Sequence, residues 1–120
     1  MVQLSQTKKP IDVEFLRSVI ENDAEFEREL FKIFIENGNR NIEKMQDSFD
    51  VSRYNFWYMA AHAFKGSSAS IGAFDLSKVL ENAQKAAEDS PEVKAKIVEE
   101  VKKEFKEVCD FISIYLARRG

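Results

Sequence analysis

The sequence is poor in the residues that break helices or build special sites: its 120 residues include four glycines, two prolines, one cysteine and one histidine. Because Gly and Pro dominate turns, so few of them leave little room for a many-stranded sheet and favour helices. The single cysteine, Cys109, excludes an internal disulfide. It lies at the margin of an apolar helical face, so we expect a packed thiol rather than a reactive one.

Further absences restrict the function. A formal net charge of −3 provides no basic surface for nucleic acid. No apolar run approaches the roughly 20 residues that a membrane span needs, and the first ten residues lack the apolar stretch of a secretory signal. We therefore expect a cytoplasmic protein without nucleic-acid or membrane partners. The sequence also lacks an ATP-binding glycine loop, so we do not expect the protein to phosphorylate itself.

Apolar residues recur at helical spacing and predict an all-α fold. Four long amphipathic helices are expected from the break at Asn22-Asp23 to about Ser48, from a cap at Ser52 to Gly72, from Ala73 to about Glu88, and from Pro91 to about Arg118. Short connections make neighbours antiparallel, which predicts an up-down-up-down four-helix bundle. A short additional N-terminal helix, with an apolar stripe of Val13, Leu16 and Ile20, is expected to cap one end.

The predicted organisation is a flexible N-terminal tail over residues 1–9 and a single domain over residues 10–120. Ser90 followed by Pro91 is a strong signal for the start of the last helix, whose many Glu and Lys residues read as its solvated face. Gly38 falls on the apolar stripe of the first long helix. It marks either a kink or the close approach of another helix, and we favour the close approach.

The only histidine, His62, lies near the centre of residues 54–72. In a helix, one face of this segment is formed by Tyr54, Trp57, Ala61, Phe64, Ser68 and Ile71. His62 falls away from that face, beside Tyr58, Lys65, Gly66 and Ala69. A neutral imidazole is a nucleophile near neutral pH, Lys65 could stabilise an anionic phosphoryl group, and Gly66 leaves room for a partner.

These residues belong to the run Ala61-His62-Ala63-Phe64-Lys65-Gly66-Ser67-Ser68, followed by Ile71-Gly72-Ala73 and Leu76. The run resembles the signature of histidine-containing phosphotransfer (HPt) domains, roughly A-H-x-L-K-G-S-[SA]-x-x-x-G-A-x-x-L. Phe64 replaces the usual leucine, an apolar exchange on the buried face. More weakly, the resemblance extends over nearly the whole chain as a helix pattern.

The resemblance implies a phosphocarrier, not an enzyme, in a two-component phosphorelay. His62 would take a phosphoryl group from the aspartyl phosphate of a receiver domain, through Nε2, and pass it to another receiver. Lys65 would stabilise the group and Gly66 would admit the partner. On the next helix the family often has Leu-Glu or Ile-Gln where this chain has Ala83-Gln84; Gln84 would hydrogen-bond the imidazole and orient it.

We expect the partners to be receiver domains of response regulators or hybrid kinases, which dock on Asn55, Tyr58, Met59 and Ala69 of a monomer. The phosphocarrier would hold no cofactor of its own, because Mg²⁺ would sit on the receiver. Phe56, Tyr58 and Met59 are either exposed as a partner surface or covered by the first helix. Lys78 and Lys85 either add positive potential or are plain solvated charges.

Two other functions compete with the phosphocarrier. One is a receiver-binding helical bundle that carries no phosphate. The other is a receiver phosphatase, for which Asn55, about two turns before His62, would have to place a water. The sequence leaves open the donor, the acceptor, the direction of net phosphate flow, the response controlled, and whether the domain is free-standing or part of a larger kinase.

Overall fold

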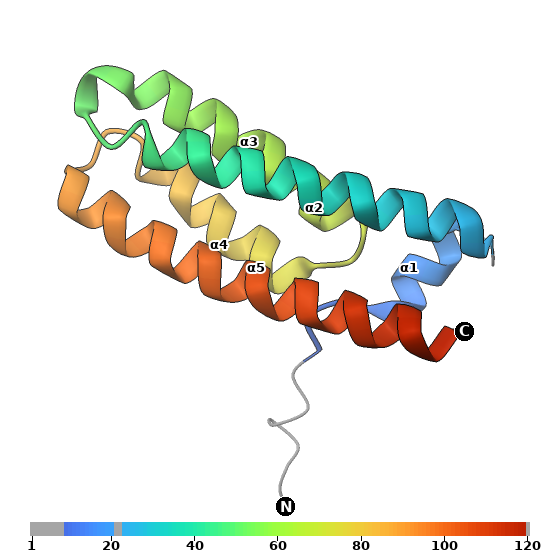
Figure 1. Ribbon diagram of the computed structural model, residues 1–120. Helices are drawn as coiled ribbons and strands as arrows, with labels where there is room; N and C mark the ends of the chain where they lie inside the picture. Colours follow the sequence, from blue (N-terminus) through green and yellow to red (C-terminus); the bar gives the residue numbers. More distant parts are fainter. Residues whose placement is uncertain (1–8, 21–22, 120) are drawn as a thin grey trace, which may run out of the picture.

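The computed structural model describes residues 9–20 and 23–119, and every regular element in these ranges is helical (Figure 1). The elements are α1 (Val13–Ile20), α2 (Ala24–Gln46), the 3-10 turn η2 (Val51–Arg53), α3 (Tyr54–Ser70), α4 (Phe74–Lys85) and α5 (Pro91–Arg119). The predicted all-α class is therefore confirmed for the described residues. Residues 1–8 of the predicted tail, and Asn22, lie outside them.

The four long helices pack around one core. α2 contacts α3 and α5, and α4 contacts the same two helices. Figure 1 shows α1 at the end of the molecule that also contains the C-terminus, far from the connection between α2 and α3. There the backbone N–H of Asp12 donates to the carbonyl of Gly72 at 2.9 Å. This bond joins the segment before α1 to the turn between α3 and α4.

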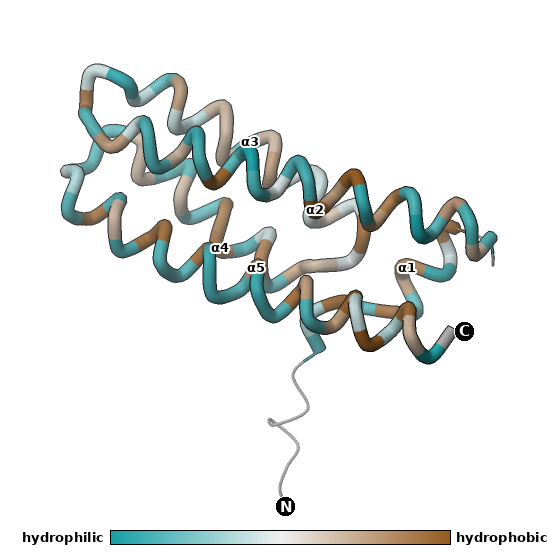
Figure 2. The backbone as a smooth tube through the Cα atoms, viewed as in Figure 1, coloured by the Kyte–Doolittle hydropathy of each residue, from teal (hydrophilic) through white to brown (hydrophobic). Residues whose placement is uncertain are grey.

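Apolar side chains of all four long helices fill the core, and Figure 2 shows hydrophobic and hydrophilic positions alternating along each helix, as amphipathic packing requires. Phe34, Phe64 and Phe105 form a cluster with ring centroids 5.5 to 6.2 Å apart. A Cβ at Gly38 would collide with the ring of Phe105. The predicted close approach at Gly38 is confirmed, because the Phe105 ring of α5 occupies the space that a side chain at position 38 would fill.

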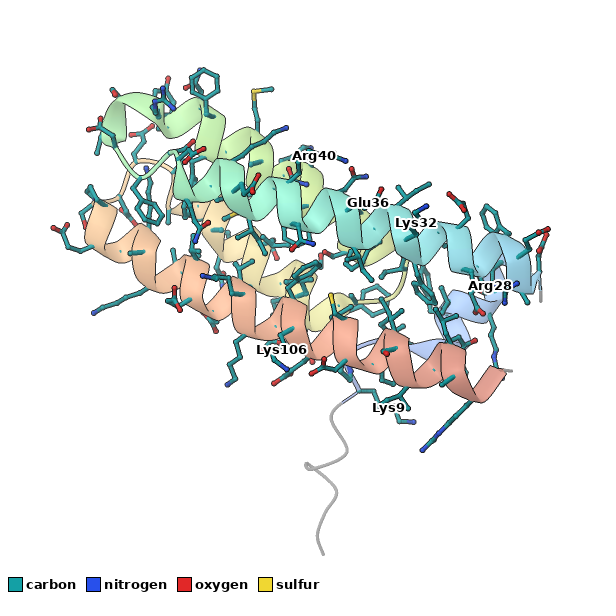
Figure 3. All side chains as sticks on the ribbon, in the orientation of Figure 1. Lys9, Arg28, Lys32, Glu36, Arg40 and Lys106 are labelled. Carbon is teal, nitrogen blue, oxygen red and sulfur yellow. The ribbon has the colours of Figure 1, made fainter. Side chains whose placement is uncertain are left out.

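Figure 3 shows Lys106 on the outer side of α5, where it pairs with Asp110 at 2.8 Å.

Most helix ends follow the predicted signals. Asp23 caps α2 by accepting a hydrogen bond from the backbone N–H of Phe26 at 2.9 Å, and the Ser90 hydroxyl accepts from the N–H of Val93 at 3.3 Å at the start of α5. Gly72 has a φ of 85°. This left-handed conformation, which suits glycine, lies just past the end of α3, as predicted.

Two predicted helix ends are wrong. Ser52 does not cap α3, because its backbone N–H and its hydroxyl both donate to the carboxylate of Asp50, at 2.8 and 2.7 Å, and Asp50 starts the turn η2 instead. α4 ends at Lys85 rather than near Glu88. The carbonyl of Ala83 accepts from the N–H of Ala86 at 3.1 Å and from the indole of Trp57 at 2.7 Å, so the last turn tightens and the helix stops.

Polar side chains from α1, α2 and α5 contact one another. The hydroxyl of Tyr115 on α5 donates to the fully buried carboxylate of Glu27 on α2 at 2.8 Å. A hydrogen bond with Tyr115 raises the pKa of Arg17, which lies on α1. These contacts link the short helix to the long ones through polar groups rather than through apolar packing alone.

Three side chains test the predicted exposure. Tyr54 was expected on the apolar face but is 48% exposed, because it is the first residue of α3 and lies beyond the edge of the core. Cys109 is half-buried, and burial raises the pKa of its thiol to about 11, in agreement with a packed thiol. Lys94 was expected on the solvated face of α5 but is fully buried. None of the helices in the described ranges combines the length and the apolar character that a membrane span requires.

The ammonium of Lys94 lies 5.4 Å from the centre of the Trp57 ring and has no hydrogen-bond partner among the described residues. Burial lowers the pKa of Lys94, and the nearby carboxylates of Asp89 and Asp50 only partly oppose this effect. The charged form of Lys94 is thus disfavoured in the folded protein, because desolvation outweighs these attractions.

We expect Lys94→Met to remain folded and to be at least as stable as the wild type at pH 7, because methionine fills similar space without a charge to desolvate. The unfolded chain holds the Lys94 proton up to its ordinary pKa of 10.5, whereas the folded chain releases it earlier. Wild-type stability relative to the variant should therefore rise as the pH increases through the folded pKa toward that value. Urea unfolding between pH 7 and 10.5 measures the difference. A variant less stable by more than about 2 kcal/mol at pH 7 would show that the contact with Trp57 dominates.

Candidate functional site

His62 lies on the outer side of α3. Trp57, Ala61, Phe64 and Ser68 of the same helix are buried, whereas the imidazole is exposed. The burial follows the helical period, because positions 57, 61, 64 and 68 recur every three or four residues and leave position 62 on the opposite side. The backbone of a regular helix thus presents the only histidine of the chain to solvent.

Gln84 on α4 brings a polar group to the imidazole. Its Nε2 atom lies 3.1 Å from Nδ1 of His62, which joins residues that are 22 positions apart in the sequence. The neighbouring residue, Ala83, accepts a hydrogen bond from the Trp57 indole at 2.7 Å. Because Trp57 and His62 belong to the same helix, this bond fixes the distance between the imidazole and the part of α4 that carries Gln84.

The orientation of the Gln84 amide determines which nitrogen of His62 can react. With Nε2 of the amide toward Nδ1, the neutral imidazole carries its proton on its own Nε2. With the amide oxygen toward Nδ1, the proton sits on Nδ1 and Nε2 keeps a free electron pair. The amide oxygen Oε1 is now buried and has no hydrogen-bond partner among the described residues. Turning the amide by half a rotation therefore breaks no bond of Oε1 and frees the outer nitrogen for attack.

Aromatic and charged side chains surround this pair. The ring of Tyr58, one turn before His62, lies nearly parallel to the imidazole, with an angle of 5° between the planes and 6.0 Å between the ring centres. Next to them is a hollow of about 230 Å³, lined by Tyr58, Lys65, Glu81, Gln84 and Lys85. Lys65 is half-buried and lines this hollow.

Gly66, one turn after His62, differs from the other helical glycine described above. Beyond its chain neighbours and the nearby backbone of its own helix, a Cβ at Gly66 would meet no described atom within 4 Å, whereas one at Gly38 would collide with Phe105. Glycine inside a helix costs about 1 kcal/mol relative to alanine. No packing contact in the described part of the chain requires a glycine at position 66. If a glycine is needed there, the need must arise from something other than packing within the described chain.

Three of the expected docking residues lie together, and one lies apart. Asn55, Tyr58 and Met59 line a pocket of about 420 Å³ that also includes Gln84. Ala69 is half-buried on α3, two turns beyond His62, and lines none of the hollows described here. Met59 is 65% exposed and Phe56 is 56% exposed. The alternative in which α1 covers them is wrong, because α1 lies at the other end of the molecule (Figure 1).

A second groove lies between α2 and α3. It has a volume of about 450 Å³ and is lined by Asn41, Lys44, Asp47, Ser48, Arg53, Phe56, Met59, Ala60 and Ala63. Of the two lysines on α4, Lys85 lines the hollow beside His62, whereas Lys78 is exposed and lines neither this groove nor that hollow. In the described ranges, no group of three or more His, Cys, Asp and Glu side chains is placed to hold a metal ion.

Sequence reasoning missed two contacts of the site. It placed Tyr58 beside His62 and expected it to dock a partner, but it did not predict the ring stack, although the four-residue spacing between Tyr58 and His62 is a signal that their side chains can meet. It also missed the bond from Trp57 to Ala83, for which the sequence offers no signal. A tryptophan on an apolar stripe predicts burial but not the carbonyl to which its N–H donates.

Comparison with known proteins identifies the family. The profile of the Hpt domain family matches residues 29–111, more than half of the chain. The chain therefore belongs to the Hpt domain family, which confirms the resemblance seen in the sequence. It also matches the crystal structure of histidine-containing phosphotransfer protein B (HptB) from Pseudomonas aeruginosa PAO1, with a TM-score of 0.81 over 93% of this chain and 98% of that chain. At 19% identity, this likeness shows a shared fold. No curated protein sequence matched significantly.

Replacing each helical glycine by alanine separates packing from access. We expect Gly66→Ala to raise the free energy of unfolding by about 0.5–1 kcal/mol, because alanine favours the helix and the new methyl group meets no described atom. Gly38→Ala is the matched control and should lower the free energy of unfolding by about 1–3 kcal/mol, because Phe105 must move. Urea unfolding of both variants measures the effects. A destabilised Gly66→Ala would mean that the fold itself needs this glycine.

Proposed function

We propose that this protein is a phosphocarrier in a two-component phosphorelay, in which His62 accepts a phosphoryl group from a receiver-domain aspartyl phosphate and passes it to another receiver. The observation that carries this proposal is the exposed imidazole whose Nδ1 is hydrogen-bonded by Gln84, in a chain of the Hpt domain family. An accessible nucleophile with a fixed orientation is what such a transfer requires.

The transfer is a displacement at phosphorus. The free electron pair on Nε2 of His62 attacks in line, the N–P bond forms, and the P–O bond to the receiver aspartate breaks with its electrons going to the carboxylate. Once the Gln84 amide has turned its oxygen toward Nδ1, the N–H of Nδ1 donates to that oxygen, which offsets the positive charge that develops on the ring. Lys65, in the wall of the neighbouring hollow, stabilises the phosphoryl oxygens.

The surface around His62 accounts for access. The open space beside Gly66 lets the receiver bring its phosphoryl group to the imidazole. Asn55, Tyr58 and Met59, together with Ala69 farther along α3, would contact the partner. A methyl group at position 66 would then slow transfer from a receiver while the fold remains intact.

Several further assignments belong to the same proposal. Mg²⁺ would be held by the receiver, and the phosphocarrier would bring no cofactor of its own and act as a cytoplasmic monomer. The helices α2 to α5 would form an antiparallel up-down-up-down bundle. Contacts between α2 and α3, α3 and α4, and α4 and α5 support this arrangement, since each joins helices consecutive in the chain, and the contact of α2 with α5 closes the ring.

Loss of the imidazole tests the phosphocarrier directly. On incubation with a phosphorylated receiver, we expect the wild type to gain an acid-labile, base-stable phosphoryl label and His62→Gln to gain none. Because His62 is exposed, the variant should unfold at the same urea concentration. A label that persists in His62→Gln contradicts the proposal. So does the absence of any label on the wild type, which favours a binding module, or the release of inorganic phosphate without a labelled intermediate, which favours a phosphatase.

The two lysines near the site provide a matched pair. We expect Lys65→Gln to slow phosphoryl transfer by about tenfold or more, because a cation that faces the developing charge is removed. Lys78→Gln removes the same charge from an exposed position that does not line the hollow, and should change the rate less than about twofold. Rates of label uptake from the same receiver measure both. Equal effects would mean that only the overall charge of the protein matters.

A further inference from the structure

The imidazole of His62 is contacted by this chain on two sides. Gln84 meets its Nδ1 edge at 3.1 Å, and the ring of Tyr58 lies beside one of its faces with only 5° between the planes. Parallel planes with centres 6.0 Å apart describe an offset stack, the geometry that aromatic rings prefer. The contacts come from different helices, since Gln84 belongs to α4 and Tyr58 to α3.

The two contacts restrict different motions. A hydrogen bond to Nδ1 fixes one atom of the imidazole but still allows the ring to tilt about that atom. A ring stacked against its face opposes this tilt. An exposed histidine without such contacts samples several rotamers, whereas in-line attack at phosphorus requires Nε2 to point in one direction. The hydrogen bond and the stack together satisfy that requirement before any partner arrives.

The direction of the helix explains why Tyr58 can do this and Gly66 cannot. Side chains of an α-helix lean toward its N-terminus, so the imidazole lies over the preceding turn, which carries Tyr58. The following turn carries Gly66, where even a Cβ would meet no described atom. Tyr58 therefore supports one side of the imidazole, and the other side stays open to the incoming phosphoryl group.

We propose that Tyr58 is a positioning residue for His62, one that fixes the orientation of the imidazole through ring stacking, in addition to any contact with a partner. This inference rests on the proposed phosphotransfer at His62. Tyr58 is 45% exposed and lines both the hollow beside His62 and the pocket that contains Asn55, so a role in docking alone is the alternative that the experiment must separate.

A small phosphoryl donor separates positioning from docking. With phosphoramidate, Nε2 of His62 attacks phosphorus, the P–N bond of the donor breaks and ammonia leaves, so no receiver surface is involved. We expect Tyr58→Leu, which removes the ring, to slow this reaction by about fivefold. Tyr58→Phe keeps the ring and should react within about twofold of the wild type. Urea unfolding checks that both variants are folded.

A Tyr58→Leu variant that reacts normally with phosphoramidate and slowly with a phosphorylated receiver would overturn the inference, because it would assign Tyr58 to docking alone. Failure of Tyr58→Phe to restore the rate would also overturn it, since the hydroxyl and not the ring would then be needed.

Nuclear magnetic resonance gives a readout that does not depend on transfer. Because the chain has one histidine, its ring signals are unambiguous. We expect cross-relaxation between the rings of Tyr58 and His62 in the wild type and in Tyr58→Phe. If the wild type shows no cross-relaxation between these two rings, the inference is overturned without any variant. A wild type that shows this contact and reacts with phosphoramidate, but accepts nothing from receivers, would instead defeat the proposed phosphorelay and leave the role of Tyr58 standing.

Discussion

The hydrogen bond from the Trp57 indole to the carbonyl of Ala83, at 2.7 Å, is the contact on which the site depends. It joins α3 to α4 inside the core, five residues before His62 and one residue before Gln84. A buried N–H must find an acceptor, so this bond permits few relative positions of the two helices. The same carbonyl accepts from Ala86, which tightens the last turn of α4. One acceptor thus sets where α4 ends and how far Gln84 must reach.

Three glycines show how the same residue serves different needs. Gly38 makes room for the ring of Phe105, and Gly72 adopts a φ of 85° beside the backbone of Asp12. Both are explained by contacts or conformation within the chain. Gly66 is not, since it lies in a regular helix and faces open space. The fold therefore tolerates a locally unfavourable residue beside the imidazole, which is the position where an incoming partner would need the space.

The sequence allowed prediction of features that depend on local chemistry or on regular spacing. Asp23, Ser90 and Gly72 act at helix ends through their own backbone and side-chain groups, and the outward position of His62 follows from helical period. Features decided by competition or by distant contacts were not predictable. Ser52 does not cap α3 because it is hydrogen-bonded to Asp50 instead, and Lys94 is buried although lysine usually marks a solvated face. The contact of Tyr58 with His62 depends on side-chain rotamers, which spacing permits but does not determine.

The helix that carries His62 is held near both ends: Trp57 bonds to α4, and Gly72, just past the other end, accepts from Asp12 at 2.9 Å. Between these attachments α3 is a continuous helix without proline. A phosphoryl group on His62, as proposed, would therefore leave the backbone of α3 unchanged and add two negative charges to its surface. A partner would then have to recognise the phosphorylated protein by its charge rather than by a change in its shape.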